Sequence, residues 1–301
     1  MIVLIITFLL LGESKSAAQV KQPAGLKTLT LGIVYQSDPK AVAEHFRPLV
    51  QYVAHKLAPA GDIKSSVEVA ANTARLIELL EQGQIDFYLE SAFPTYLINR
   101  TGSSKLLLRR WKRGMGEYRS MILTSKAIRV TRLEDLRGKM IAFEDPGSTS
   151  GYFLPKLLLF EKRFHVVEKP NLSAKVASGE IGYIFAGSEK DVVKLVLDEK
   201  VAAGAISNDD YAGLDDASKT RLAILAESGS VPRHLVSVRS KLPDAVIKRL
   251  KEILLAMDHD DEGQKILRQT DDTTKFDLVP GGEEAFRRKL YELYHLRNEK
   301  K

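Results

Sequence analysis

Apolar residues alternate between strand-like and helix-like spacing over the first hundred positions. Short apolar runs predict buried strands, and apolar residues recurring every three or four positions predict helices. The strands are expected at 29–35, 66–70 and 85–89, and the helices at 39–57, 73–81 and from about 94. Asn72 precedes the second helix and suits its N-cap. Strands that alternate with helices in this way predict parallel α/β units.

The pattern continues in a second block and ends in a helical C-terminus. The expected strands are 118–124, 139–143 and 201–207, with helices at 133–138, 152–160 and 189–197. Two further strand-like runs, 222–226 and 235–238, lead back toward the first block. Helical spacing follows at 243–257, 261–269 and 282–297. We therefore predict two α/β lobes with two crossings between them, which form a hinge beside a ligand site.

One loop carries the clearest chemistry. The strand that ends at Phe143 is followed by Glu144-Asp145-Pro146-Gly147, then by Ser148-Thr149-Ser150-Gly151, and then by an apolar helix. The three hydroxyls fall at the N-cap and first turn, where main-chain N–H groups lack helical partners. Together with the helix dipole, these donors suit a phosphate-like oxyanion. Ordinary N-capping is the competing interpretation, and turn formation is the simplest role for Glu144 and Asp145.

Composition and charge indicate a globular protein and do not favour a nucleic-acid-binding one. The chain has 301 residues, 44% hydrophobic and 28% charged residues and a net charge of +6, which is typical of a globular protein. The basic run 109–113 carries no recognised nucleic-acid motif, so we expect a solvated loop or an attractor for anions. No nucleic-acid partner is expected.

The N-terminus predicts export. Residues 2–11 are apolar, too few for a transmembrane helix of about 20 residues but right for a signal peptide. Ser16-Ala17-Ala18 supplies small residues for cleavage, although no Lys or Arg precedes the apolar run. No other apolar run would span a membrane, and without any cysteine the chain has no residue for a lipid anchor. We therefore expect residues 1–18 to be removed and the mature protein to lie in the periplasm.

The motif Asp145-Pro146-x-Ser148-Thr149-Ser150-Gly151 resembles that of the phosphonate-binding-like periplasmic proteins. Similar segments occur at 83–86, 117–120 and 133–139, so the resemblance covers nearly the whole mature chain. It implies a type 2 periplasmic-binding-protein fold, with lobe I formed by 19–118 and 229–301 and lobe II by 119–228. It also implies a phosphate, phosphite or small phosphonate ligand, and an ABC permease as partner of a monomeric protein.

The resemblance assigns the expected ligand-binding residues one at a time. Three match the family's oxyanion-binding hydroxyls, and the others align with positions near the ligand or follow the first strand. The set is Ser148, Thr149, Ser150, Tyr118, Thr73, Ser188, Asp209, Tyr35 and Arg233. Ser188 replaces a histidine of the family. Arg233 lies where a second amine-binding carboxylate is expected, which favours a simple oxyanion over an aminoalkylphosphonate.

Other functions fit less well. The loop is not Gly-x-Ser-x-Gly, the six histidines lack metal-ligand spacing, and no nucleotide-binding glycine motif is present. We expect no enzymatic activity, no metal and no cofactor. The alternative is a periplasmic ligand-sensing partner of a membrane histidine kinase. An enzyme of the related pyrimidine-synthesis type is disfavoured by export and the lack of cysteine, and neighbouring genes would separate the three hypotheses.

Overall fold

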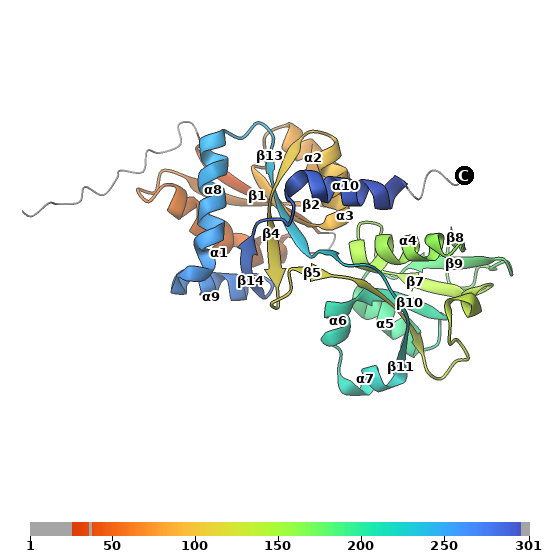
Figure 1. Ribbon diagram of the computed structural model, residues 1–301. Helices are drawn as coiled ribbons and strands as arrows, with labels where there is room; N and C mark the ends of the chain where they lie inside the picture. The colour runs from red at the N-terminus through yellow and green to blue at the C-terminus, as the bar shows by residue number, and fades with distance from the viewer. Residues whose placement is uncertain (1–25, 36–37, 296–301) are drawn as a thin grey trace, which may run out of the picture.

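The computed structural model describes residues 26–35 and 38–295, and side chains as far as residue 292. The expected signal peptide lies outside the described residues. Figure 1 shows two α/β lobes that are joined by a narrow connection through β5. Within the described ranges, no helix is both long enough and apolar enough to cross a membrane.

Lobe I is built on a six-stranded sheet with the order β14-β4-β13-β3-β1-β2. Its strands are β1 (Thr28–Val34), β2 (Lys64–Ala70), β3 (Phe87–Ser91), β4 (Ser104–Lys112), β13 (His234–Arg239) and β14 (Thr273–Asp277). Its helices are α1 (Pro39–Leu57), α2 (Thr73–Glu81), α3 (Ala92–Arg100), α8 (Asp244–Ala256), α9 (Asp261–Gln269) and α10 (Gly282–His295), with a 3₁₀ turn η3 (Met257–His259). β1 pairs in parallel with β2 and β3, as the alternation of strands and helices predicts.

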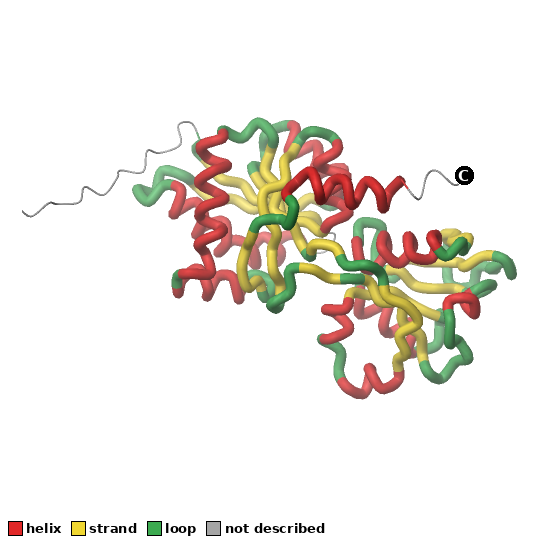
Figure 2. Tube along the Cα trace, viewed as in Figure 1, coloured by secondary structure: helices red, strands yellow, loops and turns green. Residues whose placement is uncertain are grey.

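Lobe II is built on a second six-stranded sheet with the order β11-β6-β10-β7-β9-β8. Its strands are β6 (Ser120–Ser125), β7 (Met140–Phe143), β8 (His165–Glu168), β9 (Glu180–Phe185), β10 (Ala203–Ser207) and β11 (Leu222–Glu227). Its helical segments are η1 (Leu133–Leu136), η2 (Thr149–Phe153), α4 (Leu154–Glu161), α5 (Glu189–Leu197), α6 (Asn208–Ala212) and α7 (Asp216–Arg221). In Figure 2, helices lie on both sides of the strands in each lobe.

The two crossings pair with each other. β5 (Glu117–Tyr118) and β12 (Val231–Pro232) form a two-stranded antiparallel ribbon between the sheets, with Val231 opposite Tyr118. Main-chain hydrogen bonds therefore hold the two connections side by side. This ribbon is the predicted hinge.

Local signals place the helix ends where the sequence predicts them. Asn72 caps α2 by accepting the Arg75 N–H at 2.9 Å. Ser188 caps α5 in the same way. Asp38 caps α1, and Pro39 suits the first position of that helix because its missing N–H has no helical partner there.

Two expectations are wrong, one for a strand and one for a loop. The run 222–226 does not return to the first sheet, because β11 pairs antiparallel with β6 in lobe II. The basic run 109–113 is not a solvated loop: Arg109 and Arg110 are buried in β4. Arg109 pairs with Asp277 at 2.6 Å, and Arg110 pairs with Asp271 at 2.9 Å. Because these carboxylates lie more than 150 positions away along the chain, the local sequence pattern does not predict that the arginines are buried in a strand.

An apolar cluster, which we call the inter-lobe cluster, joins the two lobes. Lobe I and the hinge contribute Ala92, Phe93, Tyr96, Leu106, Tyr118, Val231, Leu235, Val279, Phe286 and Leu290, and lobe II contributes Phe153, Leu154 and Leu157. The rings of Phe93 and Phe153 stack with centroids 4.0 Å apart and planes 7° from parallel. The cluster packs α10 and α3 against the start of α4, which Figure 1 shows as neighbours across the junction.

We predict that Arg110→Ala destabilises lobe I. The guanidinium is 2% exposed and is held by Thr273, the Thr270 and Asp271 carbonyls and the Asp271 carboxylate. Removing it takes the buried donor away from the Thr273 hydroxyl, while Asp271 keeps Lys112 at 2.9 Å. A buried polar group left unsatisfied costs about 1–3 kcal/mol. Urea unfolding measures the loss, with the exposed Arg129→Ala as control. A loss for Arg110→Ala no larger than for the control would contradict the prediction.

Candidate functional site

Three helical segments of lobe II begin side by side at one edge of its sheet. β10, β7 and β9 are adjacent and parallel, and they lead into α6, η2 and α5. Ser207, Ser148 and Ser188 are the respective N-caps. Ligands of open α/β sheets bind outside the carboxyl ends of the strands. The central position therefore belongs to η2, which starts with the predicted oxyanion motif.

The start of η2 is held by Ser148. Its Oγ accepts the Gly151 N–H at 2.9 Å and donates its own proton to Glu144 Oε2 at 2.7 Å. The first helical bond is of the π type, from Phe153 N–H to the Ser148 carbonyl at 3.0 Å. The N–H groups of Thr149 and Ser150 precede that bond and point away from the helix body as donors. The predicted capping by Ser148 is thus present in the structure.

Thr149 reaches across to lobe I. Its Oγ1 accepts the Phe93 N–H at 2.9 Å and donates to Ser91 Oγ at 3.0 Å, and the residue is 1% exposed. Ser91 and Phe93 form the start of α3, whose N-cap serine caps nothing itself. The starts of α3 and η2 therefore face each other. Thr149 is a closure contact between the two lobes as well as a predicted ligand residue.

Tyr118 lies on the hinge ribbon beneath the motif. Burial raises the pKa of its hydroxyl to about 12, opposed by the nearby Arg233 guanidinium and by hydrogen bonds with Thr149 and Ser150. The Arg233 guanidinium sits over the Tyr118 ring at 4.7 Å. The structure therefore brings Tyr118, Ser150 and Arg233 close together, and their contact with a ligand stays a prediction.

Asp209 and Arg233 form a buried ion pair across the junction. Arg233 donates from Nη2 to Asp209 Oδ2, and the two residues are 4% and 1% exposed. Arg113 lies 3.5 Å from the other carboxylate oxygen. Asp209 and Arg233, both expected to contact a ligand, thus have partners within the chain. The buried Arg233 Nε has no acceptor among the described residues. The sequence does not reveal this pairing, because 24 positions separate the two residues.

Carboxyl groups surround the start of η2. Burial raises the pKa of Glu144 to about 7, opposed by the Ser148 hydrogen bond and reinforced by Asp145, Asp210 and Glu189. Burial likewise raises the pKa of Glu90 to about 7 at the end of β3, with Asp145 adding to the effect. The sequence indicates only a turn role for Glu144 and gives no signal for Glu90. Asp145 does form the turn, accepting the Gly147 N–H at 2.7 Å.

The other expected residues lie along the same edges but further out. Thr73 begins α2 after β2, and Tyr35 follows β1 with 51% of its surface exposed. β2 and β1 are the next strands beyond β3, so these residues flank Ser91 on the edge of lobe I. Ser188 acts as a cap, accepting the Asp191 N–H at 3.2 Å and donating to its carboxylate at 2.7 Å. Within the described part of the chain, none of these three residues forms a hydrogen bond or ion pair with the motif.

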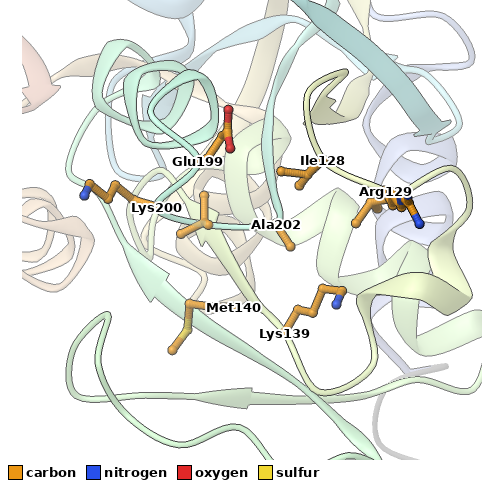
Figure 3. Close-up of a pocket in the computed structure, with 9 residues that line it drawn as sticks. Ile128, Arg129, Lys139, Met140, Glu199, Lys200 and Ala202 are labelled. Atoms are coloured by element: carbon orange, nitrogen blue, oxygen red, sulfur yellow. The ribbon is translucent and has the colours of Figure 1, made fainter.

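A separate cavity of about 330 Å³ lies at the opposite end of the lobe II sheet. Figure 3 shows it between Ile128, Ala202 and Met140, with Arg129 and Lys139 on one side and Lys200 on the other. Met140 begins β7, whereas the motif follows the end of that strand. The cavity is therefore distinct from the junction. Among the described residues, no His, Cys, Asp or Glu cluster could hold a metal ion.

Two lobes, a paired hinge ribbon and facing helix starts define a type 2 periplasmic solute-binding protein. The chain belongs to the family described as the periplasmic substrate-binding protein of the phosphonate ABC transporter, whose model matches residues 31–279. The predicted family and fold class are confirmed.

Solved structures agree with this assignment. XAC2383 from Xanthomonas citri bound to ATP is 25% identical with a TM-score of 0.82, covering 91% of this chain and 100% of that chain. The chloride-bound form is 26% identical with a TM-score of 0.83, over 90% and 99% of the two chains. PhnD1 from Prochlorococcus marinus with methylphosphonate is 15% identical with a TM-score of 0.69, over 91% and 99%, and shows the shared fold.

We predict that Glu90→Gln stabilises the protein above pH 7. The folded-state pKa of Glu90 is raised from 4.5 to about 7, so the folded state binds the proton more tightly than the unfolded state. The wild type therefore loses stability as the pH rises from about 4.5 through 7. Melting at pH 5 and pH 8 should show a gain for Glu90→Gln only at pH 8. The exposed Glu81→Gln is the control, and an equal gain at both pH values would contradict the titration.

We also predict strong coupling between Asp209 and Arg233. Asp209→Asn strands a buried cation and should cost about 3–5 kcal/mol, whereas the double variant Asp209→Asn/Arg233→Met should lose less than the two single losses combined. Chemical unfolding of the four proteins gives the coupling energy. The exposed pair Arg75 and Glu78, 2.8 Å apart, is the matched control and should show about 0–1 kcal/mol. Additive losses at Asp209 and Arg233 would show that the pair does not couple the lobes.

Proposed function

We propose that this protein is the exported solute-binding component of an ABC importer, and that it holds a phosphorus oxyanion between its two lobes. The ligand class is phosphate, phosphite or a small phosphonate. The observation that carries the proposal is the start of η2, where first-turn N–H groups, Ser150 and Tyr118 converge beside the hinge. Such a set of neutral donors suits an oxyanion.

The comparisons support the same ligand class. The family transports phosphonates, and a relative of 25% identity carries ATP, whose phosphates are tetrahedral oxyanions. Ligand entry requires the lobes to move apart at the hinge ribbon, because Thr149 contacts Ser91 and Phe93 in the closed arrangement. A bound oxyanion would take over hydroxyl groups that now bond to each other.

Domain limits and partners follow from this proposal. Lobe I would comprise 19–118 and 229–301, and lobe II 119–228, with the boundary at the hinge ribbon. The family implies a membrane permease as the docking partner and the periplasm as the site of action. The protein would act as a carrier without enzymatic activity.

Thermal melting with a panel of oxyanions tests the proposal. A ligand at about 100 times its Kd stabilises the folded state by about 2.7 kcal/mol, so phosphate, phosphite or methylphosphonate should raise the melting temperature. Ser150→Ala should weaken that binding about tenfold or more, because hydrogen bonds to charged groups contribute about 1.5–3 kcal/mol.

The control is Ser218→Ala, at a half-buried serine in α7 whose hydroxyl donates to Asp215 at 2.8 Å. It should leave affinity unchanged. Melting that no member of the panel shifts, in protein shown by mass spectrometry to be free of ligand, would overturn the proposed function. Equal weakening by both alanine variants would remove Ser150 from the site.

A further inference from the structure

Glu144 is fixed by its main chain directly in front of the oxyanion motif. Its N–H donates to the Gly151 carbonyl at 3.1 Å, and its own carbonyl accepts the Gly187 N–H at 2.8 Å. The residue thus links the end of β7 to the start of η2 and to the loop before α5.

The carboxylate lies against the first turn of η2. A β-carbon at Gly151 would overlap both the Glu144 carboxylate and its Cβ, so only glycine fits there. A hydroxyl has a single proton. Ser148 gives that proton to Glu144 Oε2 and uses a lone pair for the Gly151 N–H. Ser148 is therefore not free to donate to a ligand while Glu144 remains in place.

The surroundings of Glu144 leave its charge uncompensated. Asp145 is the next residue, Glu189 comes from α5 and Asp210 from α6, and all three are acids. Among the described residues, Glu144 forms no ion pair with Lys, Arg or His. A ligand oxygen without a proton that approached this carboxylate would meet a like charge. A ligand hydroxyl would instead donate a hydrogen bond to it.

We propose that Glu144 is a specificity-determining residue that selects oxyanions carrying a hydroxyl proton over oxyanions carrying none. This inference rests on the proposed oxyanion site. Hydrogen phosphate presents a P–OH group at pH 7 and above, where Glu144 becomes ionised, whereas sulfate has only acceptor oxygens. Asp209 does not fit this role, because its carboxylate is already paired with Arg233.

Calorimetric titration of the full mature chain with phosphate and with sulfate at pH 8.5, where Glu144 with its pKa of about 7 is ionised and hydrogen phosphate keeps its proton, tests the inference. The wild type should prefer phosphate by at least about 100-fold. Glu144→Gln replaces the carboxylate by a neutral amide that can donate to sulfate, so the phosphate-to-sulfate ratio should fall by at least about tenfold. Glu134→Gln, at an exposed carboxyl in the same lobe, should keep the wild-type ratio.

A second variant keeps the inference testable if Glu144→Gln does not fold. Ser148→Ala removes the hydroxyl but leaves the carboxylate, so it should retain the preference for phosphate at reduced affinity. Loss of the preference in Ser148→Ala, or an unchanged ratio in folded Glu144→Gln, would overturn the role of Glu144 while leaving the proposed function intact. A wild type that binds neither these anions nor any phosphonate would overturn the proposed function itself.

Discussion

The arrangement of the two lobes depends on the apolar contact between α3, α10 and the start of α4. Phe153, Leu154 and Leu157 of lobe II are buried against Phe93, Phe286 and other residues of lobe I. Burying one large apolar side chain contributes about 1.5–3 kcal/mol, so separation of the lobes must expose several such contributions to water. These apolar contacts therefore favour the closed arrangement. Under the proposed function, an oxyanion would replace the hydroxyl contacts at the junction.

On its hinge side the junction also contains a polar contact. Unlike the apolar contact, it depends on the orientation of the groups. Arg233 leaves the ribbon at β12 and reaches Asp209 in lobe II, while its guanidinium covers Tyr118. A buried ion pair adds little net stability, but separating its members leaves two uncompensated charges. Opening that kept Arg233 and Asp209 together would pivot about them. A motion that keeps the pair together therefore costs less than one that separates its members.

Much of the fold could be predicted because its signals are local. Asn72 and Ser188 cap helices that begin where the sequence indicates, and the strand–loop–helix order around Ser148 is present. β4 was missed because its arginines become buried only through Asp271 and Asp277, more than 150 positions away. The candidate site also contains both local contacts and contacts between distant residues. Capping by Ser148 is local, whereas the contacts of Thr149 with Ser91 and of Asp209 with Arg233 exist only after the lobes meet.

The electrostatics of the junction limit how an anion can be held there. The chain carries a net charge of +6, yet Glu90, Glu144, Asp145 and Asp210 all lie around the start of η2. A helix N-terminus supplies only about half a positive charge. This is less than the full negative charge of one ionised carboxylate. The acids at the start of η2 thus oppose the helix N-terminus. Under the proposed function, an oxyanion would depend on the number and direction of hydrogen-bond donors, and a ligand with its own proton would meet less repulsion from the carboxylates.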